Sequence, residues 1–270
     1  MNNRREGFTL RLSDRVVLIA GAGSGIGRAT AHAMGSEDAA IIATDIDRSQ
    51  AEAVTAELRD MGVKAIALAM DVTDGNSVRD TVARSIRHFD RIDVLVNSAG
   101  VWPADGLIDM DEAAWDRDLQ VCLTGTFLTC KHVLPHMIRQ RSGAIVSITS
   151  VNGLEFLGAE AYSSAKAGVI SLTKAVAVRY GPDGVRANAI APATIQTPIW
   201  EASHREDPEL FERLTRLYPL GRVGSPEDVA HAAVFLASEE ANWISGVVLP
   251  VDGGFLAGRQ GFVDETKDRQ

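Results

Sequence analysis

A tyrosine and a lysine four residues apart could form a proton-transferring pair. Tyr162 and Lys166 have the i,i+4 spacing that places two side chains on one face of a helix. A free phenol titrates near pH ~10, too high for a base at neutrality, but a neighbouring ammonium stabilises the phenolate and lowers the pKa. The pair is therefore a candidate general acid/base. The same spacing also occurs on ordinary solvated helix faces, so the pair needs support from other residues.

Hydroxyl groups that could orient a substrate oxygen precede this pair. Ser150 and Thr149 end the apolar run that begins at Ile145. A hydroxyl at the end of a strand there could hydrogen-bond a substrate oxygen beside Tyr162. Either residue fits this role from its position alone.

A glycine-rich turn follows the first apolar run and could hold a dinucleotide. Glycines let the backbone turn sharply and approach a pyrophosphate, and the N-terminus of the next helix offers free N–H groups and a positive dipole end. A tight turn with no ligand is the alternative. The residues that we expect to contact the cofactor are Gly21, Ser24, Gly25, Ile26 and Gly27.

Asp45 ends the second apolar run, near the distance from the glycine turn expected for an acid that binds the ribose. A carboxylate there accepts hydrogen bonds from both ribose hydroxyls and repels a 2′-phosphate, so the sequence favours NAD over NADP. A helix-capping role for Asp45 is the alternative. Arg28 and Arg48 are close enough in sequence to serve a phosphate instead.

The ends of the next two apolar runs also carry candidate cofactor contacts. Asp71 and Val72 lie where an adenine ring would rest, although an aspartate there is also a common helix cap. Asn97, Ala99 and Gly100 follow the fourth run, and small residues there would let a cofactor cross the edge of the sheet.

The elements that must position these residues alternate between short apolar runs and longer amphipathic stretches. Several runs are almost wholly apolar, as expected for parallel strands covered on both faces. Such alternation predicts an α/β fold, a doubly wound Rossmann domain of about seven parallel strands with helices on both faces. We expect strands at Val16–Ala20, Ala40–Thr44, Ala65–Ala69, Val94–Asn97, Ala144–Thr149, Ala187–Ile190 and Val247–Pro250, and helices at Arg28–Met34, Ser49–Met61, Ser77–His88, Glu112–Arg139 and Ala161–Tyr180.

No linker or repeat divides the chain, so residues 1–270 are expected to form one domain. The segment 197–220 contains three prolines and mixed charges, and we expect an irregular flap over the substrate there. The polar tail 259–270 is a candidate for subunit contacts.

Composition and charge disfavour several classes of protein. With 27 Lys and Arg against 36 Asp and Glu, the formal charge of −9 disfavours binding to nucleic acid or to an anionic membrane. The two cysteines, Cys122 and Cys130, are expected to be reduced core thiols on one side of a single helix, and the histidines lack metal-ligand spacing. No long apolar segment is present, so a cytoplasmic location is expected.

Taken together, the motifs resemble those of the short-chain dehydrogenase/reductase family from about Leu12 to Phe255. The resemblance implies that Tyr162 transfers the proton, Ser150 orients the carbonyl, and Lys166 binds the nicotinamide ribose and tunes Tyr162. It also implies hydride transfer to or from nicotinamide, carboxamide contacts from Thr197 and the backbone of Ile195, and a homotetramer. The motifs are Gly21-x-x-x-Gly25-x-Gly27, Asn97-Ser98-Ala99-Gly100, Ser150, Tyr162-x-x-x-Lys166, Pro192 with Thr197, and Val251-Asp252-Gly253-Gly254.

Four residues depart from the family pattern, namely Ala20, Ser98, Ala193 and Cys122, and the choice between Thr149 and Ser150 is a further ambiguity. Cys122 takes the place of the family's active-site Asn, whose backbone carbonyl extends a proton relay from the lysine. A backbone role survives this change, but a thiol is a poor hydrogen-bond partner. Thr149 keeps the family's interval to Tyr162, whereas the surrounding Ile-Thr-Ser-Val-x-Gly pattern favours Ser150.

The substrate pocket is expected to be mainly apolar. Trp102, Asn152 and Trp200 are the candidate walls, which suits a hydrophobic or cyclic secondary alcohol or ketone. An NADP-dependent 3-oxoacyl-thioester reductase is the alternative within the family. A weakly catalytic cofactor-sensing protein and a methyltransferase are alternatives from other classes; intact Ser150, Tyr162 and Lys166 weigh against both.

Overall fold

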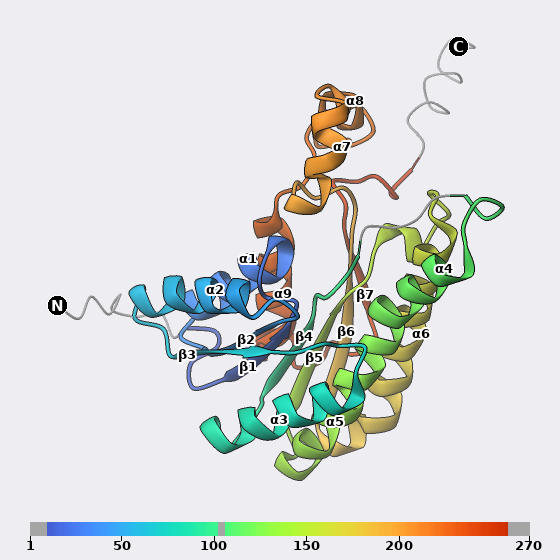
Figure 1. Cartoon of the computed structure of the whole chain (residues 1–270). Helices are drawn as coiled ribbons and strands as arrows, with labels where there is room; N and C mark the ends of the chain where they lie inside the picture. Colours follow the sequence, from blue (N-terminus) through green and yellow to red (C-terminus); the bar gives the residue numbers. More distant parts are fainter. Residues whose placement is uncertain (1–9, 102–105, 259–270) are drawn as a thin grey trace, which may run out of the picture.

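In the computed structural model, which describes residues 10–101 and 106–258, seven parallel strands form one sheet (Figure 1). The strand order is β3-β2-β1-β4-β5-β6-β7. Successive strands after β1 move toward one edge of the sheet, and those from β4 onward move toward the other, so the order reverses between β1 and β4. The strands are β1 Val16–Ala20, β2 Ala40–Asp45, β3 Ala65–Ala69, β4 Val94–Asn97, β5 Gly143–Ile148, β6 Val185–Pro192 and β7 Val248–Val251.

Helices cover both faces of this sheet. Alternate residues of β1 show why: Val17 and Ile19 pack into one apolar cluster, whereas Val16 and Leu18 pack into the other. The first face is covered by α1 Gly25–Ser36, α2 Arg48–Asp60 and α9 Pro226–Ala237. The second is covered by α3 Gly75–Phe89, α5 Gly125–Gln140 and α6 Glu160–Tyr180. The predicted doubly wound fold is thus confirmed.

The predicted helix Glu112–Arg139 is wrong in one respect, because it is not continuous. The structure has α4 at Glu112–Leu119, a π-helical turn at Gln120–Thr124 and then α5. The π turn inserts one extra residue per turn and therefore changes which side chains share a face. Cys122 lies in this turn and Cys130 in α5, and both are buried free thiols.

The segment 197–220 is also more regular than predicted. A 3₁₀ turn at Pro198–Trp200 leads into α7 Glu201–Glu206, and α8 Leu210–Thr215 follows. In Figure 1 these helices stand beyond the carboxyl ends of the strands. Prolines at the starts of turns and helices are compatible with helix, which explains why their presence did not exclude it.

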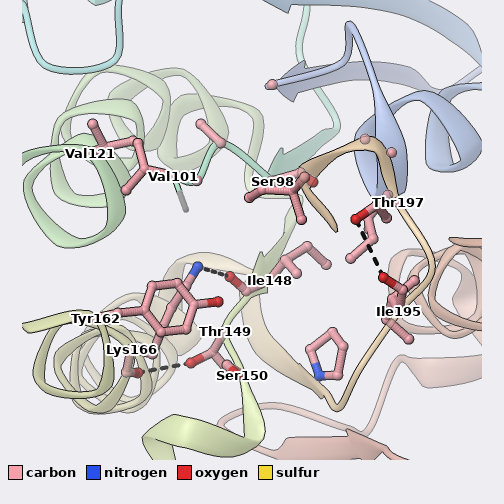
Figure 2. Close-up of a pocket in the computed structure, with 18 of the residues that line it drawn as sticks. Ser98, Val101, Val121, Ile148, Thr149, Ser150, Tyr162, Lys166, Ile195 and Thr197 are labelled. Carbon is pink, nitrogen blue, oxygen red and sulfur yellow. Dashed lines mark hydrogen bonds between the residues drawn. The ribbon is translucent and has the colours of Figure 1, made fainter. Parts of the chain in front are cut away.

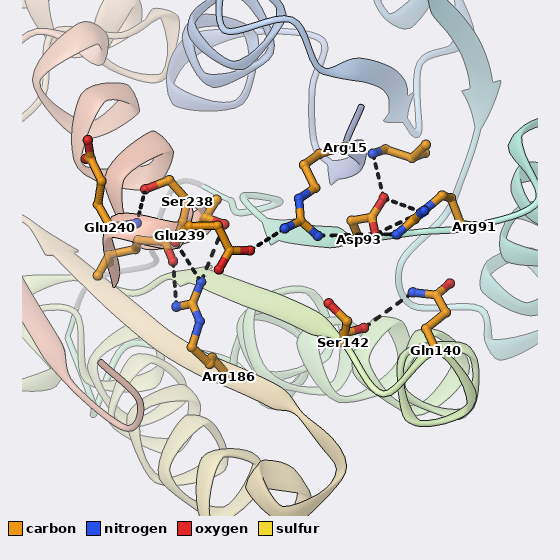
Figure 3. A network of polar contacts seen from close by, with 12 residues as sticks. Arg15, Arg91, Asp93, Gln140, Ser142, Arg186, Ser238, Glu239 and Glu240 are labelled. Carbon is orange, nitrogen blue, oxygen red and sulfur yellow. Dashed lines mark hydrogen bonds and ion pairs between the residues drawn. The ribbon is translucent and has the colours of Figure 1, made fainter. Parts of the chain in front are cut away.

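A polar network joins the strands at the opposite, amino edge of the sheet (Figure 3). Buried Asp93, just before β4, accepts a hydrogen bond of 2.9 Å from the backbone N–H of Val16 and bonds of 2.8 and 3.0 Å from Arg91. Arg15 lies between Asp93 and Glu239 and pairs with both. Nearby, Arg186 of β6 donates to carbonyls at the end of α9. Hydrogen bonds and ion pairs therefore join the strands at this edge.

Within the part of the chain that the structure describes, no helix has the length and apolar character needed to cross a membrane.

Candidate active site

A cavity of about 1210 Å³ crosses the carboxyl edge of the sheet where the strand order reverses. Its walls come from the segments that follow β1 to β6 and from α4, the π turn and the 197–220 segment. A pocket for one small ligand measures roughly 300–1,000 Å³. The cavity is therefore larger than a pocket for one small ligand.

Tyr162 and Lys166 lie in this cavity on the first turns of α6 (Figure 2). The Lys166 Nζ lies 5.4 Å from the centre of the Tyr162 ring and donates a hydrogen bond of 2.9 Å to the carbonyl of Ile148. The side chain of Lys166 is buried, at 4% exposure. A buried ammonium with three donors and one described acceptor has N–H groups to offer a ligand in the cavity.

The pKa of Tyr162 is raised above its ordinary value, chiefly because burial disfavours the phenolate. The positive charge of Lys166 and a hydrogen bond with Ser150 lower that pKa, whereas the thiol of Cys122 and the carboxyl of Asp118 raise it. Lys166 therefore acts in the expected direction, but burial outweighs it in the protein alone.

The structure gives the two neighbouring hydroxyl groups different roles. Thr149 donates a hydrogen bond of 2.8 Å to the backbone carbonyl of Lys166, so its hydroxyl anchors β5 to α6. Ser150 lies beside the phenol of Tyr162, and its Oγ lies 3.2 Å from both the Oδ1 and the backbone nitrogen of Asn152. Asn152 also lines the cavity and bonds the carbonyl of Gly158. This geometry favours Ser150 over Thr149 as the group that faces a substrate.

The glycine turn closes the other end of the cavity. Gly21 has a φ of +79°, and a Cβ on Gly27 would lie 1.8 Å from the Gly21 carbonyl oxygen, so a side chain at Gly27 cannot fit. Ser24 precedes α1 in an extended conformation and its side chain makes no cap hydrogen bond. The helix thus presents uncapped N–H groups to the cavity, beside Gly25 and Ile26. These features fit the pyrophosphate of a dinucleotide.

Asp45 lines the same end of the cavity and is not the cap of the next helix. Its carboxylate accepts hydrogen bonds from the backbone N–H groups of Gly23 at 3.0 Å and Asp47 at 3.1 Å. Asp47 caps α2 instead. Arg28 is paired with Glu57 and Arg48 with Glu52, both at 2.8–2.9 Å.

Asp71 and Val72 line the cavity, and Asp71 is likewise not a helix cap, since Asp74 caps α3. Ala99 and Gly100 line it too. Asn97 behaves differently: its side chain is buried, receives a hydrogen bond of 2.6 Å from Thr129 and lies 3.2 Å from Ser147. The side chain of Asn97 thus packs among core residues behind the site. The expected contact between Asn97 and a cofactor stays a prediction.

Residues after β6 complete the cavity beside Tyr162. Pro192, Ile195, Thr197 and Trp200 line it, and the backbone around Ile195 is fixed by a bridge to Gly224. Trp102, the remaining candidate wall, lies outside the described residues.

Several lining residues were not anticipated from the sequence. Arg117, Gln120 and Val121 reach the cavity from the end of α4 and from the π turn. Leu214, Leu217 and Tyr218 reach it from α8 and the turn that follows. The Val-Cys-Leu-Thr-Gly pattern marked the first neighbourhood, and the second lies within the segment 197–220, for which the sequence predicted a flap over the substrate without singling out these residues.

The chain is similar to known oxidoreductases over nearly its whole length. A family model described as enoyl-(acyl carrier protein) reductase matches residues 21–256. The chain is 41% identical to a short-chain dehydrogenase/reductase family oxidoreductase of Burkholderia thailandensis, whose crystal structure superposes with a TM-score of 0.87 over 94% of this chain and 97% of that one.

Curated relatives include two enzymes with different names. Cis-4-hydroxycyclohexanecarboxylate dehydrogenase of Sinomonas cyclohexanicum is 40% identical over 91% of this chain and 98% of its own. The 3-oxoacyl-[acyl-carrier-protein] reductase of Thermotoga maritima is 39% identical over 92% of this chain and all of its own.

Proposed function

Because the chain belongs to the short-chain dehydrogenase/reductase family of oxidoreductases that act on alcohols and ketones, we propose that it interconverts a secondary alcohol and a ketone with NAD. The convergence of Ser150, Tyr162 and Lys166 in one cavity that ends at Asp45 carries this proposal. We propose that residues 1–270 act as one cytoplasmic domain, assembled as a homotetramer.

Each residue of the site has a chemical role in this proposal. Tyr162 donates a proton to the substrate oxygen during reduction and accepts it during oxidation. Ser150 hydrogen-bonds the same oxygen, and Lys166 holds the ribose of the cofactor and lowers the pKa of Tyr162. The bound nicotinamide supplies or accepts the hydride. Pro192, Ile195 and Thr197 form the wall that would orient the carboxamide.

The preference for NAD rests on the charge at Asp45. Its carboxylate would accept hydrogen bonds from ribose hydroxyls and repel a 2′-phosphate. Arg28 and Arg48, the cations that could bind such a phosphate, are paired with glutamates. The 3-oxoacyl reductase relative supports an NADP-dependent thioester reductase as the second candidate.

A hydrophobic or cyclic substrate is favoured by the wall of the cavity. Ile199, Trp200, Leu214 and Leu217 supply apolar surface, and Trp200 packs edge-on against Phe211. The cyclohexanecarboxylate dehydrogenase relative supports a ring-shaped substrate.

Absorbance of NADH and NADPH with a panel of ketones and alcohols tests the proposal. We expect NADH oxidation with cyclohexanone and NAD reduction with cis-4-hydroxycyclohexanecarboxylate. Faster turnover of acetoacetyl-CoA with NADPH would establish the thioester reductase instead. NAD binding without turnover of any member would indicate the cofactor sensor.

A further inference from the structure

Tyr218 is a buried tyrosine beside the active-site cavity that no role described above explains. It follows α8 and lines the cavity, and its side chain is 7% exposed. Its ring packs against that of Phe255, which follows β7, with 5.5 Å between the ring centroids. A buried tyrosine usually directs its hydroxyl at a hydrogen-bond partner. The partner of this hydroxyl therefore indicates what the residue does.

The Tyr218 hydroxyl makes two hydrogen bonds with one residue of the strand end that follows β6. It donates to Oγ1 of Thr194 at 2.7 Å and accepts a bond of 3.2 Å from the backbone N–H of Thr194. A phenylalanine ring would serve the packing against Phe255 equally well. The hydroxyl is thus directed at the backbone that leads to Ile195 and Thr197.

A second contact to this strand end comes from Gly224, before α9. The N–H of Gly224 donates to the carbonyl of Thr194 at 3.0 Å, and its carbonyl accepts from the N–H of Gln196 at 2.9 Å. A Cβ on Gly224 would lie 2.4 Å from Cδ1 of Ile195, so only glycine permits this approach. The strand end is therefore held by hydrogen bonds from Gly224 and from the Tyr218 hydroxyl.

These contacts leave groups of the strand end to bind a ligand. The hydrogen bonds to Tyr218 and Gly224 do not use the N–H of Ile195. The Thr197 hydroxyl, which also lines the cavity, bonds the carbonyl of Ile195 at 3.3 Å (Figure 2). The proposed function assigns both groups to the carboxamide of nicotinamide. A wall that is fixed before binding costs less conformational entropy when the ligand arrives.

We propose that Tyr218 is a positioning residue for the cofactor: its hydroxyl holds Thr194 so that the Ile195 N–H and the Thr197 hydroxyl are in place for the nicotinamide carboxamide. Because Tyr218 lies near the end of the segment 197–220, the same bonds connect the predicted flap over the substrate to the wall that holds the cofactor. The inference rests on the proposed nicotinamide site.

Removal of the hydroxyl alone should weaken binding of the nicotinamide end of the cofactor. Tyr218→Phe keeps the ring against Phe255 but loses both bonds to Thr194, so the strand end spends less time in the binding conformation. We expect the Kd of NADH to rise roughly 10-fold, the upper range for the loss of one neutral hydrogen bond. The Kd of ADP-ribose, which lacks the nicotinamide, should not change.

The experiment measures the Kd of NADH and of ADP-ribose by titration calorimetry, with melting temperatures to confirm that each variant is folded. Tyr180→Phe is the matched control, because it removes the same hydroxyl at the end of α6, away from the residues that line the cavity. Thr194→Val is a second variant, since it removes the Oγ1 partner and keeps the Tyr218 ring. It should raise the Kd of NADH in the same way, but less.

A higher Kd of NADH with an unchanged Kd of ADP-ribose in Tyr218→Phe and Thr194→Val, absent in Tyr180→Phe, supports the proposal. An unchanged Kd of NADH in both variants, or equal losses for the two ligands, would overturn it, because a merely structural role affects both ligands alike. Binding needs no turnover. The outcome is therefore separate from that of the proposed function, which fails if Tyr162→Phe keeps full activity.

Discussion

The phenol of Tyr162 lies in surroundings that act on its pKa in opposite directions. Burial, Cys122 and Asp118 raise the pKa, and Lys166 and Ser150 lower it. A raised pKa keeps the phenol protonated, which suits the proton donor of carbonyl reduction. Reduction should therefore be sustained from low pH to neutrality and be lost as pH rises through the Tyr162 pKa, whereas oxidation should gain over the same range.

At Cys122 the exchange of a thiol for an amide is predicted to preserve or raise turnover. The side chain is buried in the π turn near Tyr162, where an amide can hydrogen-bond and a thiol does so poorly. Steady-state turnover of Cys122→Asn checks this, with Cys130→Ala as the control at the other buried thiol. Collapse of turnover in a folded Cys122→Asn variant would show that the thiol has a role of its own.

Loss of the Asp45 carboxylate is predicted to reduce the selectivity for NAD over NADP by about 10- to 100-fold, the range expected for hydrogen bonds to a charged group. The dissociation constants of both cofactors for Asp45→Ala give the ratio. Asp47→Ala is the control, because Asp47 caps α2 two residues further on. Tighter binding of NADP than NAD by the wild type would contradict the assignment.

The roles of single residues were only partly predictable from sequence. Asp45 and Ser150 could be placed at the cavity because Asp45 ends β2 and Ser150 follows β5 at the carboxyl edge of the sheet. Asn97 follows the same rule of position, yet its side chain points into the core, where Thr129 and Ser147 meet it. Position along a strand does not fix which way its last side chain points when a helix on that face offers a partner.

At the scale of elements, the cap of α9 also shapes the active site. Asp228 accepts hydrogen bonds from the backbone of Ser225 and from Arg222, and Gly224 beside it bridges to Ile195. The start of this helix therefore holds the strand end that carries Ile195 and Thr197. A weaker cap should loosen the wall proposed to hold the nicotinamide.

Asp228→Asn tests the contribution of this cap to stability through the pH dependence of unfolding. The Arg222 guanidinium lowers the pKa of Asp228 to about 2. A depressed pKa means that the carboxylate stabilises the fold above its unfolded-state pKa near ~4, and that this stability is lost as pH falls toward 2. The variant should lose about 1 kcal/mol at pH 7 by denaturant unfolding. The gap should narrow below pH ~4; a gap that stays constant would rule out the charge as its cause.

The predicted ends of the strands lie within two residues of those in the structure, because buried parallel strands are nearly all apolar and are easy to locate. The π turn was missed because Gln120–Thr124 reads like any other helical sequence. In the fold this turn packs against α6, and Val72, which follows β3, lies close to Gly125 just after it. Helices α7 and α8 were missed because short helices lack a full period of apolar residues.

On the scale of the whole molecule, exposed apolar side chains on the outer helices indicate where copies could meet. Phe127 of α5 is 45% exposed and Val178 of α6 is 80% exposed. The proposed homotetramer would cover them. Val178→Asp is predicted to lower the mass measured by analytical ultracentrifugation, whereas Met61→Asp, after α2 on the other face, should not. A monomeric wild type at micromolar concentration would contradict the tetramer.

The central claim is that Tyr162 transfers the proton between substrate and protein. The direct measurement is the turnover of cyclohexanone with NADH by Tyr162→Phe, with Tyr180→Phe at the far end of α6 as the control. We predict a fall in kcat of about 10²- to 10⁴-fold for Tyr162→Phe with little change in NADH affinity, and none for the control. Wild-type turnover by a folded Tyr162→Phe enzyme would contradict the claim.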